Sequence, residues 1–193
     1  VTLKAGAQNI ITISDGFTEK LFMGGNGSQA APYLIASDKQ LDNMHADDPE
    51  TGNPILKHQE RVYFRLIDDI DMADYLSANR WVPLNAVNPY DYIIDFDGNN
   101  HTIDHFCCYF DSTMDDANTQ KDPSFFGLLY GSCYDVTFTN ATITANDGPC
   151  GIIGGYVGYT GKKAVLYNVH VSATVTRTGS SGVQGTGGLA GIM

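Results

Sequence analysis

The sequence predicts an all-β fold, a right-handed parallel β-helix with a short N-terminal capping helix and a strand pair before it. Three features lead to this prediction: an internal repeat, a period of two within each copy, and glycines that bracket short apolar stretches. The 193 residues suffice for one domain with a hydrophobic core. With 42% hydrophobic and 17% charged residues, the composition is that of a globular chain.

The internal repeat aligns residues 125–144 with residues 154–176, and a third copy begins at "GGLAG". The aligned positions are Gly127 with Gly155 at an offset of 28, Val136 with Val169 at 33, and Gly154 with Gly187 at 33. A period near 30 residues, made of short apolar stretches and glycines, is typical of solenoid coils.

Apolar and polar residues alternate within each copy. One face of the predicted strand carries Val169, Val171, Ala173 and Val175. Alternation of this kind predicts a strand with one buried face. In the earlier copy Asn140 is one residue too many for the alternation, so we expect a bulge or corner there. Residues 155–158 and 188–191, which begin and end with glycine, are expected to form a second wall.

Earlier coils are expected upstream, where the pattern is less regular. Residues 61–72 and 92–103 are strand-like, and Asp97-Gly98-Asn99-Asn100 is a turn signature. Polar residues 46–60 and 111–124 are interpreted as surface loops.

A capping box precedes these coils. Ser37 and Gln40 have the required spacing, and Leu41 and Met44 supply the apolar side of a short helix at about 38–46. We expect this helix to cover one end of the solenoid, because an exposed terminal coil promotes aggregation.

Two segments are expected along the chain. Residues 1–23 form a strand pair or the end of a preceding domain, and residues 24–193 form the β-helix, truncated at its C-terminus.

Several stretches resemble, in order, those of bacterial surface proteins with GLUG-motif repeats, which also occur beside immunoglobulin A-specific metallopeptidases and in adhesins. The stretches are "APYLIASDKQLDNM", "YFRLIDDIDM", "WVPLN", "FDGNNHTIDHF", "FFGLL", "VTFTNATIT", "IIGGYVGY" and "GGLAG". The resemblance implies a β-helix on a secreted or cell-surface protein, and no particular reaction. The chain departs from the pattern at Tyr130, where a closing glycine is missing, and at Asn100, which tolerates the same left-handed backbone.

A separate resemblance concerns the start of the chain. "VTLKAGAQNIITI" is similar to the last strand of carbohydrate-binding β-sandwich modules. It implies that the parent protein handles glycans.

Charge and composition exclude some partners. The formal net charge is −11, and residues 31–125 hold 18 of the 22 acidic side chains. Such a chain repels a phosphate backbone, so we expect no nucleic acid partner. No apolar run is long enough to predict a membrane span.

Neighbouring Cys107 and Cys108 face opposite sides of a strand, so at most one lies in the core.

The sequence contains no motif for a known catalytic centre. The five histidines include no H-E-x-x-H, and neither a G-x-S-x-G elbow nor a phosphate-binding loop occurs. Asp95 and Asp97 would share a face of one strand, as a hydrolase pair requires, but Asp97 also suits the turn that follows. Asp104 and His105 faintly resemble a lyase motif. We therefore assign no catalytic residue and keep a lyase or hydrolase as the alternative.

Metal and glycan sites are the remaining possibilities. Oxygen ligands for calcium could come from Asp68, Asp69, Asp71, Asp74, Asp95, Asp97 and Asn99. The loop spacing that calcium sites follow is absent, so a solvated acidic face is the prediction, with no metal or cofactor. Most aromatic residues are expected to line the core, with Tyr130, Tyr134 and Tyr159 the best candidates for sugar stacking.

Together these features predict a non-catalytic, extracellular or cell-surface segment of a bacterial protein. Its expected task is adhesion or the binding of a host or dietary glycan or protein. Two alternatives to this prediction are left open. One is the lyase or hydrolase named above, and the other is an accessory domain of a larger secreted glycosidase or peptidase. The ligand and the oligomeric state are left open.

Overall fold

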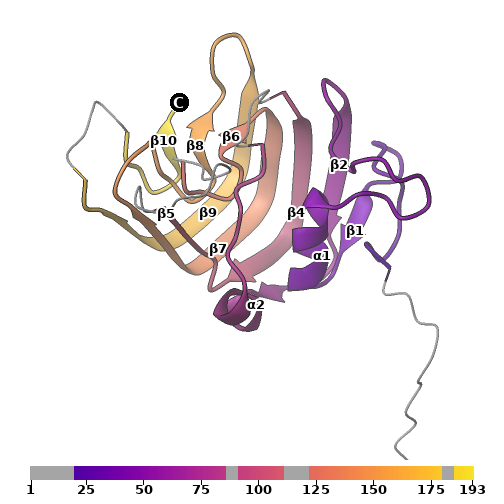
Figure 1. Cartoon of the computed structure of the whole chain (residues 1–193), viewed down its shortest axis with the longest axis horizontal. Helices are drawn as coiled ribbons and strands as arrows, with labels where there is room; N and C mark the ends of the chain where they lie inside the picture. The colour runs from indigo at the N-terminus through magenta and orange to yellow at the C-terminus, as the bar shows by residue number, and fades with distance from the viewer. Residues whose placement is uncertain (1–19, 86–90, 111–121, 180–184) are drawn as a thin grey trace, which may run out of the picture.

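The structure is a computed structural model that describes residues 20–85, 91–110, 122–179 and 185–193. Two β-sheets wind around one hydrophobic core (Figure 1). The larger sheet contains β1 (Tyr33–Ile35), β2 (Arg61–Leu66), β3 (Ile70–Asp71), β4 (Ile93–Asp104), β5 (Cys107–Phe110), β7 (Gly131–Ala145) and β9 (Ala164–Arg177). The smaller sheet contains β6 (Leu128–Leu129), β8 (Gly154–Val157) and β10 (Ala190–Ile192).

All pairings between these strands are parallel, so the chain forms a β-solenoid of about 4 turns. The larger sheet runs in the order β1, β2, β4, β7, with β9 beside β7. The long strands β4, β7 and β9 curve around the corners of the coil (Figure 1). The predicted β-helix architecture is therefore confirmed.

The register of the strands tests the repeat directly. Val136 and Val169 are Cα partners on β7 and β9, which confirms the offset of 33. Leu128 pairs with Tyr156, which confirms the offset of 28 in the second wall. The third offset is wrong, because Gly154 pairs with Ala190, an offset of 36. The segment between β9 and β10 is longer than its equivalent in the preceding coil, and a glycine motif alone does not report that length.

The inward faces of the strands form the core. Phe64, Phe96, Val136 and Phe138 are at most 1% exposed. The predicted inward row of β9 packs against the same core through Val169, Val171 and Val175, which are half-buried because β9 lies in the last coil that the structure describes. Ala173 pairs with the buried Ala141, in keeping with its predicted inward direction, but it is itself exposed because it lies in the same last coil.

Asparagine and aspartate residues turn the corners. Asn140 has φ of 48° and lies at the register shift between Phe138 and Ala141, so the predicted bulge is confirmed. At the preceding corner Asp135 and Asn168 are both left-handed. The Asn168 amide donates to the Asp135 carboxylate in the coil below at 2.7 Å, and this bond ties one corner to the next.

Positive φ angles also explain both departures from the repeat pattern. Asn100 has φ of 64°, so asparagine preserves the turn. Where Tyr130 replaces the closing glycine, Gly131 takes the left-handed conformation with φ of 123°.

Two short helices belong to the first two coils. Helix α1 (Asp38–Asp42) continues into a 3₁₀ turn, η1 (Asn43–His45), and α2 spans Ala73–Ala78. The Ser37 hydroxyl accepts a hydrogen bond from Gln40 N, and Leu41 and Met44 are fully buried, as predicted.

The free edge of β1 is paired by the chain that precedes it. Met23 N donates to Leu34 O, and Leu34 N donates to Gly24 O. The backbone of residues 23 and 24 thus satisfies this edge, while α1 contributes its apolar side to the core.

The structure can be compared with the first of the two predicted surface loops, but only with a small part of the second. Residues 46–60 contain no helix and no strand, but Ile55 and Leu56 pack into the core rather than lying on the surface. The predicted loop at 111–124 lies largely outside the described residues, as does most of the predicted strand pair at 1–23. Ser124, which belongs to that loop, is fully buried.

Candidate binding surface

One outer wall of the solenoid carries two columns of side chains that cross four strands. The columns are Tyr63, Asp95, Ser132 and Val165, and Arg65, Asp97, Tyr134 and Tyr167. We call these eight residues the tyrosine face. Their side chains point outward because the residues that alternate with them, such as Phe64 and Phe96, fill the core.

Asp95 and Asp97 share this face, as predicted, but both are already engaged. The Asp95 carboxylate accepts from the Arg61 guanidinium and the Ser132 hydroxyl. Its hydrogen bond raises the pKa of Arg61. Asp97 accepts from Arg65 Nε at 2.7 Å and from Asn99 N at 2.8 Å, the predicted turn cap.

The tyrosines differ in exposure from the prediction. Tyr159 is 56% exposed, as expected, whereas Tyr130 and Tyr134 are half-buried. Burial, followed by the charge of Asp97, raises the pKa of Tyr134. Tyr167, at 68% the most exposed tyrosine of the described residues, was missed. It alternates with Leu166 and Val169, and a strand of the last coil leaves its outward side chains uncovered.

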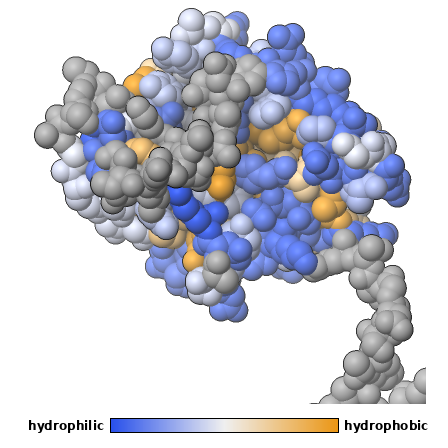
Figure 2. Space-filling view, in the orientation of Figure 1, coloured by the Kyte–Doolittle hydropathy of each residue, from blue (hydrophilic) through white to orange (hydrophobic). Residues whose placement is uncertain are grey.

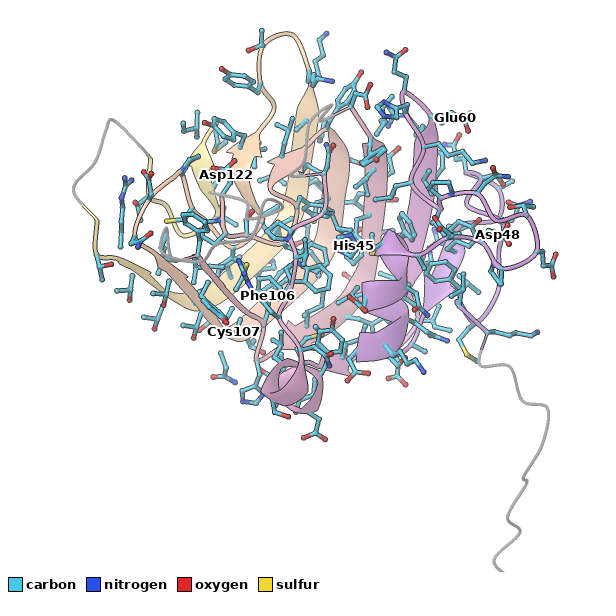
Figure 3. The ribbon with its side chains drawn as sticks, viewed as in Figure 1. His45, Asp48, Glu60, Phe106, Cys107 and Asp122 are labelled. Carbon is cyan, nitrogen blue, oxygen red and sulfur yellow. The ribbon has the colours of Figure 1, made fainter. Side chains whose placement is uncertain are left out.

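Two pockets lie beside each other where the strands of this wall begin. The first, the β1–β2 pocket, is lined by Asn26, Gly27, Ser28, Tyr33, Asp48, Thr51, Asn53, Pro54, Ile55, Lys57, Glu60, Arg61 and Val62. The second, the β4–β7 pocket, is lined by Gln59, Asp91, Ile93, Tyr130 and Lys162. The consecutive residues Gln59 and Glu60 line one pocket each, so both pockets adjoin the segment that leads into β2. Figure 3 shows Asp48 on the loop and Glu60 at the start of β2.

Backbone hydrogen bonds hold the rim of the wall together. Gln59 N donates to Asp91 O at 3.2 Å, and Ile94 N donates to Tyr130 O at 2.8 Å. The Asp91 carboxylate is nearly buried and lies 2.7 Å from His58 Nδ1. The Lys162 ammonium lies 4.9 Å from the centre of the Tyr130 ring. The pocket therefore combines a nearly buried acid, an aromatic ring and a cation.

The acidic residues proposed for calcium do not converge on one point. Asp95 and Asp97 pair with arginines on the tyrosine face, whereas Asp69 and Asp71 bond to His101 and His105 near a corner. The Asp69 pKa is lowered, first by the hydrogen bond from Thr102 N and then by the one from His101.

Asp71, Asp104 and His105 are the group that could hold a cation among the described residues, with ligand atoms within 4.8 Å of one another. The Asp104 carboxylate also accepts from Thr139 at 2.7 Å and Asn140 at 2.8 Å. Those side chains lower the pKa of Asp104. The pair that resembled a lyase motif thus serves the corner of the coil.

The four cysteines are free. Cys108 is buried and Cys107 half-buried, which confirms that only one of the two lies in the core. Burial raises the pKa of Cys108 to about 12, so its thiol is unreactive in the folded chain.

The described surface is mostly hydrophilic in the view of Figure 2, with small, separate hydrophobic patches. Among the described residues, none of the helices has the length and apolar character needed to cross a bilayer.

The comparisons with known proteins give one match. The structure is similar to the crystal structure of a "putative immunoglobulin A1 protease" from Bacteroides ovatus, with a TM-score of 0.72 and 35% sequence identity. The match covers 89% of this chain and 44% of that protein, so the chain spans less than half of its length. No family model matches the sequence, and no curated protein matches it. The similarity agrees with the predicted association with immunoglobulin A peptidases, whereas the GLUG motif stays a prediction.

Proposed function

We propose that this chain is a non-catalytic recognition segment of a larger secreted bacterial protein of the peptidase type, and that it binds a glycan or a glycosylated protein outside the cell. The similarity to part of a protein named for the cleavage of immunoglobulin A1 supports the context. The tyrosine face supports the role.

The observation that carries the proposal is the pairing of Tyr134 with Tyr167 on adjacent coils. Neighbouring strands are about 4.8 Å apart, so the two tyrosines are direct neighbours on the outer wall. Next to it Val165 is 57% exposed. Exposed tyrosines combine apolar area with a polar tip, which suits both sugar stacking and protein contacts.

A binding experiment tests this proposal. The chain is passed over immobilised immunoglobulin A1, with and without its glycans, and over a glycan array. We expect saturable binding that Tyr167→Ala weakens about tenfold, roughly 1.4 kcal/mol. Tyr159→Ala is the control, because Tyr159 is also largely exposed, at 56%, but lies outside the tyrosine face. Absence of binding, or equal effects of the two variants, would contradict the proposal.

A polysaccharide lyase or hydrolase remains the second candidate, because Asp95 and Asp97 do share a face beside Tyr134. We favour recognition, since both carboxylates already accept hydrogen bonds from arginine side chains of the neighbouring coil. Release of new reducing ends from a polysaccharide by wild type, and its loss in Asp95→Asn, would support the enzyme instead.

A further inference from the structure

We infer that the β1–β2 pocket and the β4–β7 pocket together form one binding site for an uncharged oligosaccharide that runs along the solenoid axis across the starts of the strands. The inference deepens the proposed function, on which it rests, by naming a site and a class of ligand.

The position of the two pockets supports a single elongated ligand. The β1–β2 pocket includes Glu60 and Arg61, and the β4–β7 pocket includes Gln59 on the same segment. From β2 to β7 the wall crosses two strand spacings, roughly 10 Å. A tetrasaccharide can reach both pockets over this distance, whereas a disaccharide fills only one.

The charges of the lining residues favour an uncharged ligand. Asp48 and Glu60 are the acidic and Lys57 and Arg61 the basic lining residues of the β1–β2 pocket, and Asp91 and Lys162 are those of the β4–β7 pocket. The formal charges of each lining thus cancel, and because Arg61 also pairs with Asp95, neither pocket has an excess of positive charge. The whole chain has a net charge of −11. An acidic polymer would gain nothing from the pockets and would be repelled by the rest of the chain.

The chemistry of the lining residues favours sugars. Each pocket is lined by one tyrosine, Tyr33 or Tyr130, together with hydrogen-bonding side chains. One face of each ring is already covered, by the Phe22 ring stacked on Tyr33 with centres 4.5 Å apart and by the Lys162 ammonium over Tyr130. The amides and hydroxyls come from Asn26, Ser28, Thr51, Asn53 and Gln59. An aromatic ring with amide and carboxylate partners matches the apolar face and the hydroxyl edge of a pyranose.

The rim is also rigid enough to act as a site. The nearly buried Asp91 carboxylate lies 2.7 Å from His58 Nδ1, and the His58 and Tyr92 rings are in edge contact with centres 5.6 Å apart. Asn85, which is 4% exposed, donates to Leu128 O at 2.9 Å and to Tyr92 O at 3.3 Å. Binding would therefore cost little ordering of the protein.

The experiment uses a glycan array with neutral and acidic oligosaccharides, followed by calorimetry with the best neutral tetrasaccharide, its disaccharide unit and tetragalacturonate. We expect the neutral tetrasaccharide to bind about tenfold or more tightly than its disaccharide. Tyr130→Ala and Asn53→Ala, one in each pocket, should each weaken binding about tenfold. Tyr159→Ala is the control, and thermal unfolding verifies that each variant is folded.

Four results would overturn the inference: no neutral oligosaccharide binds, the disaccharide binds as tightly as the tetrasaccharide, tetragalacturonate binds more tightly, or only one pocket variant has an effect. Glycoprotein binding that depends on Tyr167 but not on Tyr130 or Asn53 would leave the proposed function standing while this site fails.

Discussion

Arg65 and Asp97 form an ion pair between consecutive coils, with Nε donating to Oδ2 at 2.7 Å. They are also Cα partners in the register of β2 and β4. The Arg65 side chain is 46% exposed, whereas Asp97 is only 9% exposed. The carboxylate therefore depends on its partner for solvation, while the guanidinium retains contact with water.

Arg65→Gln should lower the free energy of unfolding by about 1 kcal/mol, the upper end for exposed pairs, because it leaves a nearly buried carboxylate without its cation. Chemical denaturation with urea measures the change. Lys57→Gln is the matched control, because the Lys57–Glu60 pair is exposed on both sides with N and O 3.8 Å apart. A loss for Lys57→Gln as large as that for Arg65→Gln would contradict this reasoning.

Val171→Asp should destabilise the last described coil, because a carboxylate would replace a side chain that packs against the core. We expect a loss of about 1–3 kcal/mol in the free energy of unfolding. Ser172→Asp adds the same charge on the exposed side of the same strand and should change little. If both variants unfold at the wild-type temperature, the inward assignment of Val171 is wrong.

Gly131→Ala should cost more than about 1 kcal/mol, because φ is 123° and an added Cβ would lie 2.2 Å from Ile94 O. Gly52→Ala is the control for backbone conformation alone. Gly52 also has a positive φ, of 66°, but its Cβ would meet nothing within 4 Å. Thermal unfolding of both variants separates the close approach of two coils from the strain of a left-handed residue, and equal losses would remove the packing argument.

Asp104→Asn should make stability less sensitive to acid. The Asp104 pKa is lowered in the folded chain, so its contribution is fully present above the unfolded value, about 3.9. It is lost as pH falls through the lower, folded value. The difference in melting temperature between wild type and Asp104→Asn should therefore be constant at pH 5 to 7 and shrink below about pH 4. A difference that is independent of pH would show that the hydrogen bonds of Asp104 do not depend on its charge.

The repeat and the alternation of residues were sufficient to predict the coils. Val136 and Val169 occupy equivalent positions because each fills the same place in the core of its coil. Each copy of the repeat therefore carries an apolar residue at this position. The bulge at Asn140 was also predictable, since an extra residue in a period of two has to leave the strand.

The binding surface depends on contacts between side chains of neighbouring coils, and the pattern within one coil does not predict them. Asp95 and Asp97 could be placed on one face, but only the structure shows which arginines neutralise them, because those partners lie more than 30 residues away on the neighbouring coil. For the same reason Tyr33 and Tyr130 could not be assigned to adjacent pockets.

The chain by itself thus determined which residues face inward, where the corners fall and that the coils stack in parallel, because burial of apolar side chains is a local demand repeated in each turn. The tertiary structure decided the offset of the last coil, the burial of Ile55 and Leu56, the exposure of Tyr167 and the charge balance of the two pockets. These depend on the lengths of connecting segments and on which side chains meet between coils, and neither is fixed by the pattern within one coil.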